Sequence, residues 1–263
     1  MPTLIFDCDG VLADTERDGH RPAFNQTFAE VGLPVRWSEA EYGEKLKIGG
    51  GKERMASLLT DEFVQRNQLP ADAAGRKQLL ADWHRRKTAI YKAMVEAGQL
   101  PARSGIARVV TEALDAGWSL AVASTSAEES VRAVLDHAVG TAAAAHFAVF
   151  AGDAVGAKKP DPAIYELALE QLGISAPDAI VIEDSRNGLL AAVGAGLRCV
   201  VTLSGYTGDE DMSQAVLVVT SLGDPGEPAR VVANRGAARP GDQITLTDLD
   251  ACRTQPLRVK EAV

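Results

Sequence analysis

Two carboxylates at the end of the first predicted strand are the residues most suited to chemistry. Asp7 and Asp9 follow the apolar run at 3–6, and Gly10 comes directly after them. Because side chains alternate along a strand, both carboxylates can face one pocket, and the glycine permits a sharp turn. The alternative is an ordinary strand-end turn, in which Asp and Gly are common.

A second acidic pair follows another apolar run. Glu183 and Asp184 come directly after residues 179–182. In open α/β sheets ligands bind at the carboxyl ends of the strands, so we expect this pair near the first one. Carboxylates gathered there repel one another unless a cation lies among them, and all-oxygen ligands favour Mg²⁺. Helix capping by Asp184 or Ser185 is the alternative, and it explains one residue rather than the set.

Hydroxyl groups and a lysine could bind an anion at the same edge. The run at 119–123 ends in Ser124, Thr125 and Ser126, before a predicted helix. Hydroxyl and backbone N–H groups at a helix N-terminus can bind an anion, although helix capping alone is the simpler interpretation. Lys159, held before Pro160, could pair with a phosphate and with a carboxylate. A solvated surface lysine is the alternative.

Apolar runs alternate with helical patterns through most of the chain. This alternation predicts an α/β fold, a doubly wound parallel sheet covered by helices on both faces. The strands are expected at 3–7, 119–123, 147–150, 179–182 and 198–201, and the helices at 106–116, 128–139, 162–172 and 188–195. The tail after Gly223 is expected to be a loop with a last short strand near 244–246.

Residues 16–99 break this rhythm and predict an inserted helical domain. Helical periodicity covers 21–31, 53–64 and 76–96, with Gly and Pro between. The catalytic core would then comprise 1–15 and 100–263, and the cap domain 16–99. The insert carries a net charge of +2 and the remainder −11. This would suit a metal in the core and an anion held by the insert, although random scatter gives similar numbers.

Composition excludes several classes of protein. The chain has 263 residues, 46% of them hydrophobic, and a net charge of −9. It can therefore bury a core, and its negative charge argues against general binding of nucleic acid or anionic membranes. No apolar run approaches the ~20 residues of a membrane span. Three cysteines cannot form a disulfide framework, which indicates a reducing compartment. We identify no signal or transit segment at the start.

Together these motifs resemble the haloacid dehalogenase (HAD) superfamily of phosphohydrolases. The Asp-x-Asp-Gly motif, a strand-end hydroxyl, Lys-Pro and Glu-Asp occur in that order and spacing. The resemblance implies that Asp7 is the nucleophile, forming an aspartyl-phosphate, and that Asp9 protonates the leaving alcohol and then deprotonates water. Ser124 and Lys159 would bind the transferring phosphoryl group. The implied Mg²⁺ ligands are Asp7, Asp184 and the Asp9 carbonyl, with Glu183 nearby. Dehalogenases of this superfamily lack the second Asp, so Asp9 favours phosphate chemistry.

The inserted domain has its own candidate residues. The three glycines at 49–51, followed by Lys52 and Arg54, resemble a backbone nest for an anion, although a flexible turn is the alternative. His84-Arg85-Arg86-Lys87 is a second basic cluster on a predicted helix. Adjacent residues on a helix point ~100° apart, so only one or two of these can face a site. Glu16 could bind sugar hydroxyls or simply begin the first helix favourably.

Longer motifs resemble the CbbY proteins, and especially the plastid CbbY-like branch. They include Asp14-Thr15-Glu16, Gly-Gly-Lys-Glu-Arg at 50–54, His-Arg-x-Lys at 84–87 and Glu-Asp-Ser-x-Asn-Gly at 183–188. The resemblance implies a phosphatase that converts xylulose-1,5-bisphosphate to xylulose 5-phosphate and so removes an inhibitor of Rubisco, an enzyme of the Calvin cycle. The implied substrate-binding residues are Glu16, Tyr42, Gly50, Gly51, Lys52, Arg54, His84, Arg85, Lys87, Ser124, Thr125, Ser126 and Lys159.

Two other functions stay open at this point. A β-phosphoglucomutase-like mutase would use the same Asp7 and Asp9, but Ala127 stands where the related mutases carry Lys. A non-catalytic sensor of phospho-sugars would not need both the nucleophile and the acid. The resemblance implies the chloroplast stroma as location, or otherwise the cytoplasm. We expect a monomer whose partner is a sugar bisphosphate, with no nucleic-acid or membrane partner.

Overall fold

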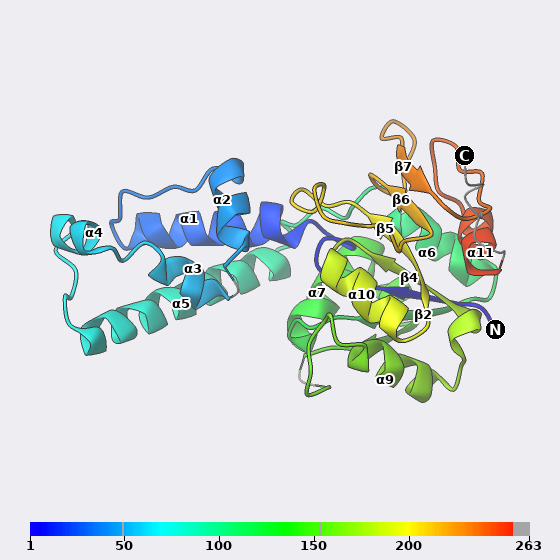
Figure 1. The fold of residues 1–263 in the computed structure, drawn as a ribbon, viewed down its shortest axis with the longest axis horizontal. Helices are drawn as coiled ribbons and strands as arrows, with labels where there is room; N and C mark the ends of the chain where they lie inside the picture. Colours follow the sequence, from blue (N-terminus) through cyan, green and yellow to red (C-terminus); the bar gives the residue numbers. More distant parts are fainter. Residues whose placement is uncertain (49, 153, 255–263) are drawn as a thin grey trace. The chain divides into compact units, whose positions relative to one another are not determined.

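The computed structural model describes residues 1–48, 50–152 and 154–254, and the chain divides into two compact units (Figure 1). Met1–Thr15 and Leu100–Val263 form one unit, here called the sheet unit. Glu16–Gln99 form the other, here called the helical unit. Each unit is described by itself below.

The sheet unit is built on one seven-stranded sheet in the order β3-β2-β1-β4-β5-β6-β7. Its first six strands run parallel and β7 is antiparallel at the edge. The strands are β1 (Thr3–Phe6), β2 (Ser119–Ala123), β3 (Phe147–Phe150), β4 (Ala179–Glu183), β5 (Arg198–Thr202), β6 (Leu217–Val219) and β7 (Val231–Asn234). The predicted α/β class is confirmed, and β1 lies in the middle of the sheet, as its fully buried side chains require.

Helices cover both faces of this sheet. The helices α9 (Ala163–Leu172) and α10 (Arg186–Gly194) pack on one face against alternate strand residues such as Ile5 and Val181 (Figure 1). The other face is covered by α6 (Ile106–Asp115), α7 (Glu128–Val139) and α11 (Leu246–Thr254). A short α8 (Thr141–Ala144) and a 3₁₀ turn η2 (Ala176–Asp178) complete this unit.

The tail differs from the sequence prediction. The strand expected near 244–246 is wrong, because α11 begins at Leu246. The Thr245 hydroxyl accepts from the Asp248 N–H (3.3 Å) while the Asp248 carboxylate accepts from the Thr245 N–H (3.1 Å). This reciprocal capping starts a helix. Residues 231–234, expected to be loop, instead form the edge strand β7.

Within the described residues 16–48 and 50–99 the helical unit contains helices and loops and no strand. Its elements are the π-helical turn η1 (Thr15–His20), α1 (Arg21–Glu30), α2 (Glu39–Leu46), α3 (Gly51–Ala56), α4 (Asp61–Arg66) and α5 (Ala73–Glu96). The single helix expected at 53–64 is wrong, because Thr60 caps a new helix by accepting from the Phe63 N–H (3.2 Å).

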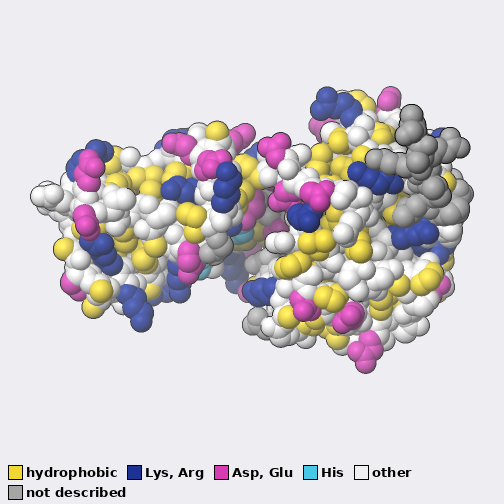
Figure 2. Space-filling model, in the orientation of Figure 1, with side chains coloured by type: hydrophobic (Ala, Val, Ile, Leu, Met, Phe, Trp, Pro, Cys, Tyr) yellow, Lys and Arg dark blue, Asp and Glu magenta, His cyan; other side chains and the backbone are white. Residues whose placement is uncertain are grey.

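On the face drawn in Figure 2, basic and acidic side chains are interspersed over the helical unit. Among the described residues, no helix has the length and apolar character needed to cross a membrane.

Candidate active site

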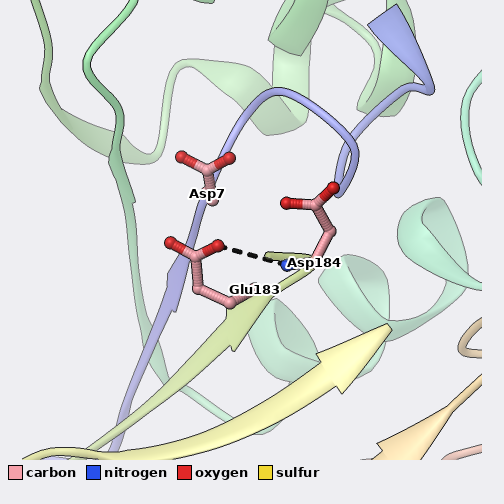
Figure 3. Close-up of side chains that lie close together, drawn as sticks. All are labelled: Asp7, Glu183 and Asp184. Atoms are coloured by element: carbon pink, nitrogen blue, oxygen red, sulfur yellow. Dashed lines mark hydrogen bonds between the residues drawn. The ribbon is translucent and has the colours of Figure 1, made fainter. Parts of the chain in front are cut away.

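Three buried carboxylates meet at the carboxyl edge of the sheet. Asp7 follows β1, Glu183 ends β4, and Asp184 comes next. Their side chains point toward one another in Figure 3, and one oxygen of each lies within 4.8 Å of the others. Carboxylates this close and this deeply buried repel one another unless a positive charge lies among them.

The strand register brings these acids together. Phe6 of β1 lies beside Ile182 of β4, and the Asp7 N–H extends the ladder by donating to the Ile182 carbonyl (2.9 Å). Gly10 then turns the chain with a φ of +77°. A Cβ at Gly10 would lie 2.0 Å from the Asp184 carboxylate, so only glycine leaves space for this acid.

Burial makes the charged forms of these acids unfavourable. It raises the pKa of Asp7 to about 7, with Lys159 opposing the rise and Glu183 and Asp9 adding to it. Burial also raises the pKa of Asp184 well above its usual range, and Glu183 and Asp7 add to this rise. A divalent cation would remove the conflict, and three carboxylate donors fit Mg²⁺.

Lys159 lies inside this acidic cluster. Its Nζ donates to Asp7 Oδ1 (2.7 Å), to Glu183 Oε1 (2.7 Å) and to the Ala123 carbonyl (2.9 Å). Burial would lower the pKa of Lys159, but the two carboxylates outweigh it and raise the pKa. The lysine is therefore a charged group of the site and not a solvated surface residue.

The Asp9 side chain faces a different set of groups. One oxygen accepts from the Thr15 hydroxyl (2.6 Å) and the other accepts from the Ser126 hydroxyl. Ser124 is buried, and its hydroxyl accepts from the Ser126 N–H (3.2 Å). Thr125 is half-buried beside them. The hydroxyl run after β2 therefore lies next to Asp9, whose carboxylate is not part of the three-acid cluster.

Tyr165 belongs to the site and was missed from the sequence. This fully buried residue of α9 donates its hydroxyl to Glu183 Oε1 (2.6 Å), and its ring centre lies 4.9 Å from Lys159 Nζ. The other oxygen, Glu183 Oε2, accepts from the Asp184 N–H (3.1 Å). The only signal in the sequence is a polar-tipped aromatic residue on an otherwise apolar helix face.

Three predicted residues of the helical unit form one group. The Tyr42 hydroxyl donates to Glu16 Oε2 (2.6 Å). Arg54 Nη1 donates to the Tyr42 hydroxyl (3.1 Å) and lies 3.4 Å from Glu16 Oε1. Tyr42 is fully buried, and burial together with Glu16 raises the pKa of its hydroxyl. In this group the partly exposed Glu16 carboxylate lies beside the Arg54 guanidinium.

A second group in the helical unit is positively charged. A Cβ on Gly51 would lie 3.1 Å from His84 Nε2, so the α3 backbone passes close to this ring. Lys87 is buried, and its Nζ lies 2.8 Å from His20 Nδ1. Burial lowers the pKa of His84, and the charges of Lys87 and Lys52 lower it further. Gly50, with a φ of +94°, precedes α3, and Gly49 lies outside the described residues.

Arg85 and Arg86 lie apart from this group. Arg85 pairs with Asp82 and Arg86 pairs with Glu30 (2.8 Å). Both arginines line a separate pocket with apolar residues that include Leu79. Since adjacent helix residues point ~100° apart, α5 places His84 and Lys87 on one side and these arginines elsewhere.

Comparisons with known proteins agree with this geometry. A family model described as haloacid dehalogenase-like hydrolase matches residues 1–196. A CBBY-like protein from Arabidopsis thaliana is 49% identical over 224 residues, which cover 85% of this chain and 70% of the relative. Protein CbbY from Cereibacter sphaeroides is 42% identical over 227 residues, covering 86% of this chain and 94% of the relative.

A solved structure is also similar. The crystal structure of a mutant CbbY from Rhodobacter sphaeroides in complex with xylulose-(1,5)bisphosphate is 41% identical, with a TM-score of 0.67. The similarity covers 84% of this chain and 94% of that one.

Proposed function

The chain belongs to the haloacid dehalogenase-like hydrolases, in the group of CbbY and CbbY-like proteins, and from this we propose that it is an Mg²⁺-dependent sugar-bisphosphate phosphatase. The observation that carries the proposal is the salt bridge between Lys159 and Asp7 beside Asp184. A lysine in that position lets an anionic nucleophile and an anionic phosphate approach each other.

The reaction divides into two displacements at phosphorus. Asp7 attacks, an aspartyl-phosphate forms, and the bond to the leaving sugar oxygen breaks. Asp9 gives that oxygen its proton, and it later takes a proton from the water that attacks the aspartyl-phosphate. Asp9 accepts one bond on each oxygen, from Thr15 and from Ser126, and these two hydroxyls would hold its carboxyl group in place.

The remaining residues of the sheet unit bind and orient. Ser124 and Lys159 would bind the transferring phosphoryl group. The Asp7 and Asp184 side chains and the Asp9 carbonyl would hold Mg²⁺, which supplies neutralisation of the phosphate charge. Glu183, whose two oxygens accept bonds from Lys159, Tyr165 and the Asp184 N–H, would mainly orient its neighbours.

The helical unit supports a bisphosphate as the substrate. Its positive group at Gly51, Lys52, His84 and Lys87 has the charge needed to bind a second phosphate, and Gly50 and Arg54 adjoin it. Glu16 and Tyr42 would bind sugar hydroxyls. Xylulose-1,5-bisphosphate is the proposed substrate, because it is the ligand of the similar solved structure. Arg85 is left out, since it pairs with Asp82. Removal of a Rubisco inhibitor in the chloroplast stroma stays a prediction from the resemblance.

A substrate screen tests the proposal. The protein is assayed with sugar mono- and bisphosphates, and released phosphate is measured with Mg²⁺ and after chelation. We expect release from xylulose-1,5-bisphosphate, loss of activity with chelator and restoration by Mg²⁺. Return of the phosphoryl group to sugar, with no phosphate released, would indicate a mutase instead.

The Asp7→Asn variant tests the nucleophile in the same assay. Turnover should fall by a factor on the order of 10⁶ while the circular dichroism spectrum stays that of the wild type. Acid quenching should trap phosphate on the wild type alone. Retained activity would exclude Asp7 as the nucleophile.

A further inference from the structure

Arg103 ties together three loops around the acidic cluster. It lies in the segment that returns the chain to the sheet unit, between Leu100 and α6. Its Nη1 donates to the Gly10 carbonyl and to the Thr202 carbonyl (3.0 Å) and hydroxyl (3.1 Å). Its Nη2 donates to the carbonyls of Leu203 (2.6 Å) and Thr220 (2.8 Å). One guanidinium thus holds the loop after β1 and the ends of β5 and β6.

One of these loops carries groups that would hold a metal ion, and the loop after β5 lies beside Asp184. Gly10 follows Asp9 and provides the space that Asp184 occupies. The Thr202 hydroxyl donates to the Glu183 carbonyl (3.4 Å). Ser204, one residue beyond Leu203, has its side chain beside the Asp184 carboxylate. The peptide group before Asp184 and the Asp184 side chain therefore both contact the segment after β5 that this guanidinium holds.

Arginine is suited to this role and lysine is not. The guanidinium carries five N–H donors in a rigid planar fork, so it can satisfy carbonyls from several segments at once. A lysine has three donors on one flexible nitrogen and would reach only some of them. The positive charge of Arg103 also opposes the repulsion among the acids.

We propose that Arg103 is a positioning residue for the metal site: by binding the Gly10 carbonyl it fixes the loop after β1 against Asp184, so that the Asp9 carbonyl and the Asp184 carboxylate can ligate one cation. The inference rests on the proposed function, because that function requires Mg²⁺. Residues that orient metal ligands without touching the metal typically change metal affinity by about 10–100-fold when they are replaced.

Direct metal binding tests this inference. Mn²⁺ is titrated into the full chain, and free Mn²⁺ is measured by electron paramagnetic resonance. We expect Arg103→Met to weaken Mn²⁺ binding by about 10–100-fold and Arg103→Lys to give an intermediate loss. Activity against Mg²⁺ concentration should show the same order, with a larger change in the half-saturating Mg²⁺ than in the KM for substrate.

Arg108→Met is the matched control. Arg108 also donates to backbone carbonyls of the sheet unit, at Leu222, Gly223 and Ile244, but none of these lies in the loop after β1 or the loop after β5. The Arg108→Met substitution should lower the melting temperature of the protein and leave its affinity for Mn²⁺ unchanged.

The outcomes separate this inference from the proposed function. Equal Mn²⁺ affinity in the wild type, Arg103→Lys and Arg103→Met would overturn the role of Arg103 alone. If Arg103→Met does not fold, an unchanged affinity in Arg103→Lys is sufficient to overturn it. A wild type that binds no Mn²⁺ would overturn the inference and the proposed function together.

Discussion

The Glu183 carboxylate occupies the space that a side chain on Gly188 would need. A Cβ built on Gly188 would lie 1.9 Å from the Glu183 carboxyl carbon and 2.0 Å from each of its oxygens. Gly188 lies in the first turns of α10, so the start of this helix passes directly against the carboxylate that holds Lys159. The glycine therefore matters for the position of a charged group rather than for backbone freedom.

The Gly188→Ala variant tests this contact. Alanine in a helix is normally more favourable than glycine by about 1 kcal/mol. Here the added methyl must displace Glu183, and overpacking of this kind typically costs about 1–3 kcal/mol. We expect a lower free energy of unfolding and a lower kcat. Gly208→Ala is the control, because nothing lies within 4 Å of that Cβ. A stabilised and fully active Gly188→Ala variant would contradict the contact.

Removal of the Tyr165 hydroxyl should impair catalysis through Glu183 and Lys159. Tyr165→Phe keeps the ring beneath Lys159 but removes one donor to Glu183. Without this donor Glu183 and Lys159 are held less firmly beside Asp7, and since a loss of about 1.4 kcal/mol in transition-state stabilisation is tenfold in rate, we expect kcat to fall by roughly tenfold. Thr27→Val removes a buried hydroxyl bond from the helical unit (2.7 Å) and should leave kcat unchanged. If Tyr165→Phe lowers stability but not kcat, the Tyr165 hydroxyl stabilises the fold and has no role in catalysis.

Lys52 of α3 and Arg85 of α5 should differ in their effect on bisphosphate binding. Lys52→Ala should raise the KM for a sugar bisphosphate by roughly 10–100-fold, since a hydrogen bond to a charged group is worth about 1.5–3 kcal/mol. The KM for a small aryl phosphate should not change. Arg85→Ala removes an equal charge from the side of α5 away from His84 and Lys87, and it should alter neither KM value. An equal effect of both substitutions would show that the face with His84 and Lys87 does not define the phosphate site.

Acid should destabilise the protein through His84. Its pKa lies below the usual histidine range because it is partly buried, with Lys87 and Lys52 adding to the effect. The unfolded chain therefore binds a proton more readily, so this contribution to stability is present above about pH 6.5 and is lost as the pH falls through the folded-state pKa.

Urea unfolding at several pH values measures this effect. His84→Gln should make the free energy of unfolding less dependent on pH between about 7.5 and 5.5, around the usual histidine pKa. His137→Gln replaces an exposed histidine and should keep the wild-type dependence. Added sulfate should also reduce the wild-type dependence, because a bound anion stabilises protonated His84. An unchanged pH dependence in His84→Gln would contradict the prediction.

The sheet and its acids could be predicted because their signals are local. The apolar runs before Asp7 and before Glu183 are long enough to identify strands, and parallel strands place their carboxyl ends at one edge. The sequence pattern could not reveal Tyr165 or Arg103, whose partners are distant in the chain: Tyr165 bonds to Glu183, and Arg103 bonds to Thr202 and Thr220. Such contacts depend on how α9 and the returning segment pack.

The strand predicted near 244–246 is wrong for a different reason. Ile244-Thr245-Leu246 alternates like a strand, but the Thr245–Asp248 capping pair decides in favour of a helix. The sequence also does not predict which way each side chain of 84–87 points on α5, because all four residues are basic and none is apolar. Packing of Trp83 and Lys87 into the unit settles which sides face inward.

The extent of the sheet has a practical consequence for anyone who shortens this chain. The family model ends at residue 196, but β5 pairs directly with β4 and α11 packs on both strands. Cutting at that boundary would remove β5, one of the two neighbours of β4, and leave the backbone groups on that side of β4 open to pairing with another molecule. A trimmed gene should therefore yield aggregates, and the segment from Leu197 to Thr254 has to be retained for soluble expression.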